Sequence, residues 1–257
     1  MQRYQWRHLV RQILHLTWAA LKSRYRKTFA GFIWVLLNPL IMFGAQSLAF
    51  KKFLRLDIPN FYVFLLSGLL PWIFMTQTIQ MGTPALVLNG PMLKSFKFHP
   101  MVLVISVALD NFINFILSLL LIGIPALIFS DSSLMGLIYA PICLLPFVIG
   151  SISITMLTSL MNVFFRDTNF VLGFLFPILF FVTPIFYPLE FIPDSYHWIV
   201  DFNPFYQFIR PLRLAMYSEV PFDWVRPWFI SMGWALSFCL LSYYYWKKKI
   251  NAVYIHL

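Results

Sequence analysis

Residues 101–129, MVLVISVALDNFINFILSLLLIGIPALIF, form an apolar run that contains a single ionisable side chain, Asp110. Five other apolar runs, none of which contains an ionisable residue, lie at 31–50, 61–81, 134–160, 170–188 and 227–246. A helix needs about 20 apolar residues to cross a hydrocarbon core of ~30 Å, and lipid offers the backbone no hydrogen-bond partner. The sequence therefore predicts an all-α integral membrane protein with six transmembrane helices.

The composition leaves room for one membrane domain and little else. The chain has 257 residues, of which 60% are hydrophobic and 11% are charged, whereas about 25% of the residues of an ordinary soluble domain are charged. We expect a single domain over residues 1–257. Its parts are a cytoplasmic helix at 1–30, spans one to five at 31–188, an outer segment at 189–226, and span six with a basic tail at 227–257.

The basic residues predict which ends of the spans face the cytoplasm. With a cytoplasmic N-terminus, the inside segments carry 13 Lys and Arg residues and the outside segments carry 6. Because cytoplasmic loops are enriched in Lys and Arg, both termini are predicted to be cytoplasmic. Lys51, Lys52 and Arg55 in the first outside loop are the contrary signal, and they weaken this prediction without reversing it.

Residues 3–27 precede the first span and have the pattern of an amphipathic helix. Arg3, Arg7, Arg11 and His15 recur every four residues, so they share one helix face. The opposite face is mainly apolar and carries Trp6, Leu9, Val10, Ile13, Leu14 and Leu21. Such a helix is expected to lie flat in the membrane interface. The pattern fits a plain surface anchor and a working part of the protein equally well.

The longest external segment, 189–226, is rich in aromatic residues rather than polar ones. Its prolines, Pro193, Pro204, Pro211 and Pro221, divide it into short pieces. We therefore expect short helices before the last span, which lie at the outer interface or dip into it.

Several classes of enzyme site are absent from the sequence. The ten glycines are never closer than eight residues apart, which excludes a P-loop and a dinucleotide fingerprint within this chain. No His-Glu-x-x-His and no Gly-x-Ser-x-Gly motif is present. The five histidines have no metal-ligand spacing, and both cysteines lie within spans. The sequence thus predicts no catalytic residue, no metal site and no cofactor bound by this chain.

Asp110 is the one intramembrane ionisable residue. A carboxylate inside a span costs about 2.5–3.5 kcal/mol on insertion scales unless it is paired or hydrated. A proton-relay or substrate role is one interpretation. The other is an interhelical hydrogen bond or ion pair, with Asn111, Asn114 or Arg166 as the partner. A single acidic residue without a relay chain favours the structural interpretation.

The stretch RYRKTFAGFIWVLLNP at 24–39 resembles the start of the membrane subunits of polysaccharide-exporting ABC transporters, the ABC-2 type permeases of O-antigen, capsule and teichoic acid export. Further matches to this family, in chain order, are SGLLPW at 67–72, Asn89, Leu93 and Pro100 in the cytoplasmic loop, Arg166-Asp167, TPIFYP at 183–188, Ile192-Pro193, Asn203-Pro204 and Arg213. One departure is that Phe96-Lys97-Phe98-His99 precedes Pro100 and no Arg follows it, where family members often have Pro-Arg.

The resemblance implies a permease without its own ATPase site that exports a lipid-linked polysaccharide of O-antigen or capsule type. It implies a homodimer with two copies of a separate P-loop ATPase, which binds ATP and Mg. The substrate is expected to be a glycan joined through a diphosphate to polyprenol, and the location is the cytoplasmic (inner) membrane of a bacterium. No nucleic acid is expected as a partner.

The same resemblance suggests where the substrate binds. Arg24, Arg26 and Lys27 are expected where the diphosphate enters, since Arg holds phosphate oxygens bidentately, although such a cluster is also typical of topology charges. Trp34, Phe174 and Phe181 are expected to face the sugar chain in the pore. Helical spacing puts Phe170, Phe174 and Phe181 on one face of span five, with Phe176 and Phe180 on the other. Aromatic stripes in membrane spans more often face lipid or pack against other helices. The assignment of Trp34, Phe174 and Phe181 to the pore therefore depends on the resemblance.

Two further sets of residues are expected to move. The cytoplasmic loop 82–100, with a short helix near 83–89, either contacts the ATPase or is a plain connector. The expected contact residues are Asn89, Leu93, Lys94 and Lys97, and the helix in 1–30 would move with them as a cytoplasmic gate. The outer segment is expected to be re-entrant and to close the exit. We use the name outer gate for Pro184, Tyr187 and Pro188 at the end of span five, together with Asn203 and Pro204 of the outer segment.

Three other functions compete with polysaccharide export. An ion-coupled carrier or glycolipid flippase would need several intramembrane ionisable residues, whereas this sequence has only Asp110. A membrane-embedded transferase would need clustered carboxylates or histidines near one interface, whereas the acidic residues here are scattered. An ABC-2 permease for a drug or another lipid is separated from the polysaccharide branch only by analogy.

Overall fold

The computed structural model describes residues 2–25, 33–53, 55, 57–96, 99–130, 134–217 and 223–256. Every regular element in these ranges is helical, which confirms the all-α prediction. The α-helices are α1 (Gln2–Tyr25), α2 (Trp34–Ser47), α3 (Phe61–Gly82), α4 (Ala85–Leu88), α5 (Gly90–Phe96), α6 (Met101–Ser118), α7 (Ile124–Ile128), α8 (Ala140–Phe164), α9 (Thr168–Val182), α10 (His197–Asp201), α11 (Pro204–Tyr217) and α12 (Val225–His256). The shorter helical turns are the π-helices η2 (Leu48–Phe53) and η3 (Leu119–Gly123) and the 3₁₀-helices η4 (Leu134–Ile138), η5 (Leu189–Phe191) and η6 (Asp194–Tyr196).

In the part of the chain that the structure describes, three helical segments are long and apolar enough to cross a membrane, by length and composition. They are Phe61–Gly82, Met101–Ile128 and Ala140–Phe164, and they match the second, third and fourth predicted spans. The fifth predicted span corresponds to α9, which is apolar but has only 15 residues. The helix ends at Val182, and the backbone is extended at Thr183. The total of six spans stays a prediction.

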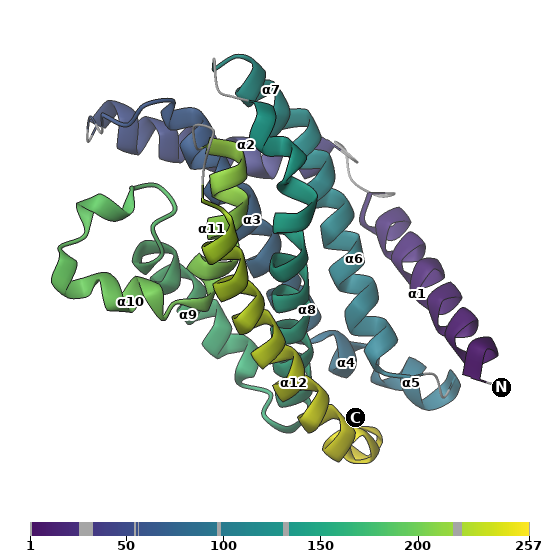
Figure 1. The fold of residues 1–257 in the computed structure, drawn as a ribbon. Coiled ribbons are helices and arrows are strands. Elements are labelled where there is room, and N and C mark those ends of the chain that lie inside the picture. The colour runs from purple at the N-terminus through teal and green to yellow at the C-terminus, as the bar shows by residue number, and fades with distance from the viewer. Residues whose placement is uncertain are drawn as a thin grey trace.

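The centre of the molecule is a bundle in which α3, α6, α8 and α12 lie alongside one another (Figure 1). Helices α8 and α12 pack most extensively, and they run parallel. Trp228 Nε1 donates to the Ile142 carbonyl and Trp246 Nε1 donates to the Met156 carbonyl, each at 2.9 Å. The buried side of α12 includes the small residues Ser231, Ala235 and Ser242. Small residues let two helix backbones approach closely, which is how helices associate where lipid replaces water.

Helix α11 enters the bundle and packs against α3, α8 and α12. Ten of its 14 residues are buried. A Cβ atom at Gly150 of α8 would lie 2.3 Å from the ring of Phe208, so the absence of a side chain lets this ring of α11 pack on α8. The segment before the last span therefore contains a helix that dips into the core, in addition to the short helix α10 at the surface (Figure 1).

Helix α1 runs alongside α6. Thr17 is buried at this contact, and its hydroxyl lies 2.8 Å from the Ile13 carbonyl and 3.4 Å from the Ser106 carbonyl. Val10, Leu14 and Trp18, which are four residues apart, are exposed. One face of α1 thus packs on the bundle, and the expectation that this helix lies in the membrane interface stays a prediction.

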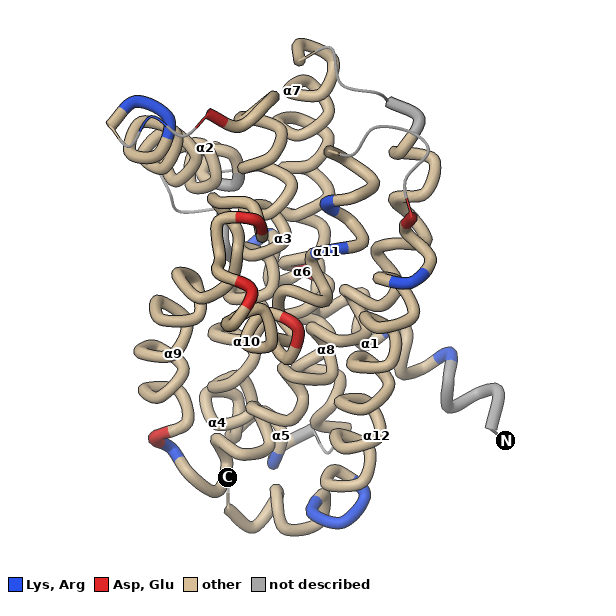
Figure 2. The backbone as a smooth tube through the Cα atoms, turned by 60° about the vertical axis from the view of Figure 1, so that its left-hand side comes forward, with Lys and Arg blue, Asp and Glu red and all other residues tan. Residues whose placement is uncertain are grey.

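Helix α2 crosses the bundle instead of running parallel to it (Figures 1 and 2). It has 14 residues with Pro39 inside, and it continues as the π-helix η2. The first predicted span therefore forms a helix that is steeply inclined to α3. Basic residues mark both ends of the bundle: those of α5 and of the last part of α12 lie at one end, and those of η2 lie at the other (Figure 2).

Candidate functional site

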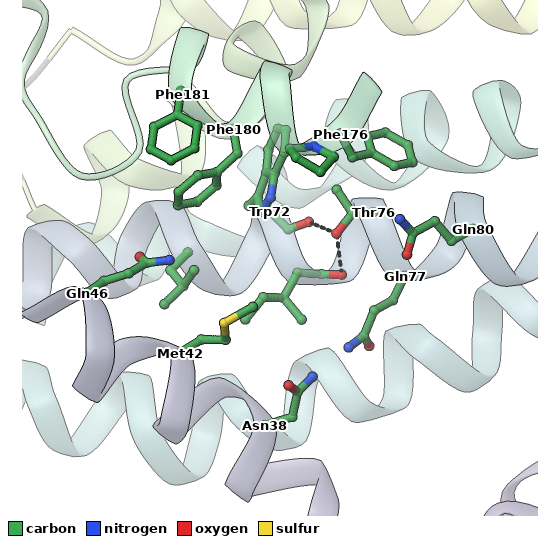
Figure 3. A pocket seen from close by; sticks show the side chains of 13 residues that line it. Asn38, Met42, Gln46, Trp72, Thr76, Gln77, Gln80, Phe176, Phe180 and Phe181 are labelled. Atoms are coloured by element: carbon green, nitrogen blue, oxygen red, sulfur yellow. Dashed lines mark hydrogen bonds between the residues drawn. The ribbon is translucent and has the colours of Figure 1, made fainter. Parts of the chain in front are cut away.

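A groove with a volume of about 380 Å³ lies between α2, α3 and α9 (Figure 3). Its walls carry two kinds of side chain, aromatic rings and carboxamides. The lining residues are Asn38, Met42 and Gln46 of α2, Leu69, Trp72, Ile73, Thr76, Gln77 and Gln80 of α3, and Phe176, Pro177, Phe180 and Phe181 of α9. We call this cavity the amide groove.

The aromatic wall is held in place by ring contacts around Trp72. The Trp72 ring centroid lies 6.4 Å from that of Phe176 and 5.8 Å from that of Phe180. The ring centroid of Phe205 on α11 lies 5.9 Å from that of the same indole. Trp72 is 6% exposed and Phe176 is 3% exposed, so these rings are fixed by packing, as edge-to-face aromatic clusters are.

The carboxamides come from α2 and α3. Asn38, Met42 and Gln46 are four residues apart and therefore lie along one face of α2, and Gln77 and Gln80 are one turn apart on α3. Among the 13 lining residues drawn in Figure 3, the only hydrogen bonds that a side chain makes to another lining residue run from Thr76 Oγ1 to the backbone oxygens of Trp72 and Ile73. The Gln46 Oε1 atom is buried and has no hydrogen-bond partner within the described chain.

The groove is more exposed at one end than at the other. Gln46 and Gln77 are half-buried, whereas Asn38 and Gln80 are exposed. The more exposed end lies where α2 diverges from α3 (Figure 3). A chain-like ligand could therefore enter along the α2–α3 crossing and contact the aromatic wall.

Of the three residues expected to face sugar, only Phe181 lines this groove. Trp34 and Phe174 lie outside it and are 50% and 75% exposed. Phe170 and Phe181 are likewise exposed, while Phe176 is buried and Phe180 half-buried, so helical spacing sorted the faces of α9 correctly. Sequence reasoning missed Trp72 and the carboxamides; their signal was the recurrence of amides at helical spacing inside apolar runs.

One of the outer gate residues, Pro184, is bound by Arg213 of α11. The Arg213 guanidinium donates from Nη1 to the Pro184 carbonyl and from Nη2 to the Ile185 carbonyl, the latter at 2.9 Å. Its carbon Cζ lies 4.5 Å from the centroid of the Phe64 ring. These contacts, which we call the Arg213 bridge, join α11 to the break that ends α9. A Cβ atom at Gly68 would lie 1.9 Å from Nη2, so glycine makes room for the guanidinium.

A second link ties the same break to the start of α11. Asn203 Nδ2 donates to Thr183 Oγ1 at 2.8 Å. Asn203 Oδ1 accepts from the backbone N–H groups of Phe205 and Tyr206, at 3.0 and 3.4 Å. Asn203 thus caps a helix whose first residue is Pro204, the position that proline tolerates best. Tyr187 donates its hydroxyl hydrogen to the Phe181 carbonyl at 2.8 Å, while Pro188 precedes η5.

The cytoplasmic loop folds into α4 and α5, close to the expected short helix. Leu93 is fully buried, in a cluster with Trp246 and Val253 of α12. Asn89 Nδ2 donates to the Ala85 carbonyl at 2.8 Å, and Lys94 is exposed. Lys97 lies outside the described residues. The loop is therefore packed on the bundle through Leu93 while Lys94 remains accessible.

The remaining predicted residues are placed less completely. Arg26 and Lys27 lie outside the described residues, and of Arg24 the structure describes only the backbone at the end of α1. Asp110 is 1% exposed on α6. Among the described residues, no group of three or more His, Cys, Asp or Glu side chains could hold a metal ion.

Comparisons with known proteins agree with one another. The family model described as "ABC-2 type transporter" matches residues 11–217. The O-antigen export system permease protein RfbA of Myxococcus xanthus is 34% identical over 192 residues, which cover 75% of this chain and 73% of that protein. RfbA of Klebsiella pneumoniae is 26% identical over 231 residues, 89% of each chain. The polysialic acid transport protein KpsM of Escherichia coli is 24% identical over 226 residues, 85% of this chain and 82% of that protein. With a family match over most of its length, this chain belongs to the ABC-2 type transporter family.

Proposed function

We propose that this chain is the permease subunit of an ABC transporter that exports a lipid-linked polysaccharide, of O-antigen or capsule type, across the cytoplasmic membrane of a bacterium. The observation that carries the proposal is the amide groove, which combines aromatic faces with carboxamides on apolar helices. The relatives named as O-antigen export permeases and polysialic acid transport proteins support the same class of cargo.

The chemistry of the groove suits a sugar chain. Sugar rings present C–H faces that pack on aromatic rings, and their hydroxyl groups both donate and accept hydrogen bonds, as a carboxamide does. Trp72, Phe176 and Phe180 supply the packing surface, and Gln46, Gln77 and Gln80 supply the polar partners. The expected sugar-facing role of Phe181 fits this arrangement, while Trp34 and Phe174 are proposed to face the pore only when a second copy is present.

The transporter is proposed to be a homodimer with two copies of a P-loop ATPase that binds ATP and Mg. A two-fold axis would bring the exposed aromatic face of α9 and the open side of the groove toward the second copy. The proposal counts six spans, of which α2 with η2 is the most inclined, and it places both termini in the cytoplasm. Arg24, Arg26 and Lys27 would then meet the substrate diphosphate at the cytoplasmic surface.

Energy from the ATPase is proposed to enter through α4 and α5. Lys94 is accessible to a partner, and Leu93 connects α5 to the last part of α12. Asn89 and Lys97 complete the proposed contact. Movement would pass to α1, which packs on α6, and to the outer gate, which the Arg213 bridge and Asn203 hold against α11.

The test is deletion of the gene in its native host, followed by complementation with a tagged copy. The deletion strain is expected to accumulate a polyprenyl-diphosphate-linked glycan inside the cell. Its cell surface is expected to lack the corresponding polysaccharide. A pull-down in mild detergent should recover a stoichiometric P-loop subunit whose ATP hydrolysis is sensitive to vanadate. Recovery of a dimer without an ATPase, together with transport that survives ATP depletion, would refute the proposal and favour an ion-coupled flippase.

A further inference from the structure

The polar groups of the amide groove are all uncharged. Four of the 13 lining residues carry a carboxamide, Thr76 carries a hydroxyl, and none has an ionisable side chain. The Thr76 hydroxyl lies within hydrogen-bond distance of two carbonyls of its own helix, at 2.9 and 3.3 Å. The carboxamides and the indole N–H of Trp72 are therefore the groups that remain to bind something from outside the chain.

A carboxamide on an apolar helix is costly unless it finds a partner, because burying an unpaired amide loses its hydrogen bonds to water. Gln46 is such a carboxamide, since its Oε1 atom is buried and has no hydrogen-bond partner in the described chain. Gln77 and Gln80 of α3 also line this cavity. The groove thus requires a ligand, or water, that supplies both donors and acceptors along the length of α3 from Trp72 to Gln80.

We infer that the amide groove takes an uncharged stretch of the polysaccharide, and that neither the diphosphate nor an acidic sugar is its ligand. The inference rests on the proposed function and narrows its substrate class. An anion would lie against the negative faces of Trp72 and Phe180, and no cation among the lining residues would offset the loss of its hydration. A sugar hydroxyl meets neither obstacle.

Neutral partners also suit a cargo that must keep moving. Hydrogen bonds to ionised groups are roughly twice as strong as those between neutral groups. Carboxamides on two helices offer several weak contacts in succession, so a sugar chain can release one while it forms the next. A groove lined by Asp or Arg would hold individual residues of the polymer more tightly and slow its passage.

The experiment compares substitutions at Gln77 in the complemented deletion strain, with surface glycan measured per permease in the membrane. Gln77→Met keeps the length of the side chain and removes its hydrogen bonds, while Gln77→Glu and Gln77→Lys add charges of opposite sign. Asn251→Asp and Asn251→Lys are matched controls, because Asn251 is exposed near the C-terminal end of α12, outside the groove. The same substitutions at the exposed Gln80 repeat the comparison if a Gln77 variant fails to accumulate.

The wild-type chain is expected to restore export of a glycan whose repeat unit contains no acidic sugar. Gln77→Met should lower export roughly three- to ten-fold, the loss of about one neutral hydrogen bond. Gln77→Glu and Gln77→Lys should lower it by factors within three-fold of each other, and both Asn251 variants should match wild type. An acidic repeat unit, a difference above three-fold between Glu and Lys, or wild-type export by Gln77→Met would overturn the inference. Failure of the wild-type chain to restore any polysaccharide would instead overturn the proposed function.

Discussion

Replacing Arg213 by Met should loosen the outer end of the molecule. Met fills nearly the same space beside Gly68 and Phe64, but it cannot donate to the carbonyls of Pro184 and Ile185. Each carbonyl that is buried without its donor costs about 1–3 kcal/mol, and the lost contact with the Phe64 ring adds about 0.5–2 kcal/mol. Because the guanidinium is buried, its removal also recovers part of a desolvation cost. We therefore expect a net loss of about 2–3 kcal/mol, from the lower half of these ranges.

The assay is thermal unfolding of the purified protein in mild detergent, followed by fluorescence-detected size exclusion. At about 2–4 °C per kcal/mol, the apparent Tm of Arg213→Met should fall by about 4–12 °C. The Tm of Arg213→Lys should fall by a smaller amount, because its ammonium can still donate to one of the two carbonyls, although it cannot span both as a planar guanidinium does. Arg210→Met is the matched control: Arg210 lies one turn earlier on α11, is half-buried, and has its Cζ atom 6.0 Å from the Tyr206 ring. It should change the Tm by less than about 2 °C, since it removes only one weak cation–π contact.

A second measurement locates the loosening. Ile185 is fully buried, so a cysteine placed there should react slowly with a soluble maleimide, in a background where the exposed Cys239 is replaced by Ser. The Arg213→Met substitution should raise the labelling rate at position 185 at least ten-fold, as a loss of about 1.4 kcal/mol or more in local stability requires. If Arg213→Met and Arg210→Met have the same Tm and the same labelling rate, the Arg213 bridge does not hold the α9 break, and the reasoning is refuted.

Three further predictions concern the same fold. Gly68→Ala should lower the Tm as Arg213→Met does, because the added Cβ atom would overlap Nη2 of Arg213. In a double-mutant cycle with the same assay, the double variant should lose less stability than the sum of the two single losses. Asn203→Ala should cost about 1–2 kcal/mol through the lost cap of α11 and the lost bond to Thr183, whereas Asn251→Ala on the exposed end of α12 should be neutral. Burial lowers the pKa of His99, whose Nδ1 accepts from the Met101 N–H at 3.3 Å, so the unfolded chain binds the proton more readily and stability should fall as pH drops below about 6.5. His99→Gln should flatten the Tm-versus-pH curve between pH 7 and 5, and an unchanged slope would contradict this assignment.

The helical segments could be read from the sequence because each apolar run is self-contained. Whether 61–81 forms a helix depends only on local composition and on the need to satisfy its own backbone, and α3 begins and ends within one residue of that run. The direction of α2 was not readable in this way. Its inclination depends on contacts with two other helices, α3 and α6, and not on its own composition. The break at Thr183 was visible as a Thr-Pro pair, and Arg213 was named as a family match, but the hydrogen bonds from Arg213 to the carbonyls of Pro184 and Ile185 were not visible.

The amide groove was missed for a related reason. Helical spacing separated the exposed Phe170, Phe174 and Phe181 from the inward Phe176 and Phe180, and the exposures on α9 confirm this. Spacing on a single helix cannot say which face meets a groove, because that depends on where α2 and α3 lie. The Gln77–Gln80 pair was a signal of its own, since two amides one turn apart in a span need partners on the same side.

Arg213 and the carboxamides of the amide groove differ in whether their polar groups find hydrogen-bond partners within the chain. This difference separates a structural role from a functional one. Arg213 is buried, and its hydrogen bonds end on carbonyls of the same chain, which fixes α9 against α11. The carboxamides of Gln46, Gln77 and Gln80 face a cavity in which they bond to none of the other lining residues. On apolar helices, polar side chains of the second kind are a cost to the fold. They are expected where something from outside the chain, a sugar polymer in our proposal, supplies the missing partners during transport.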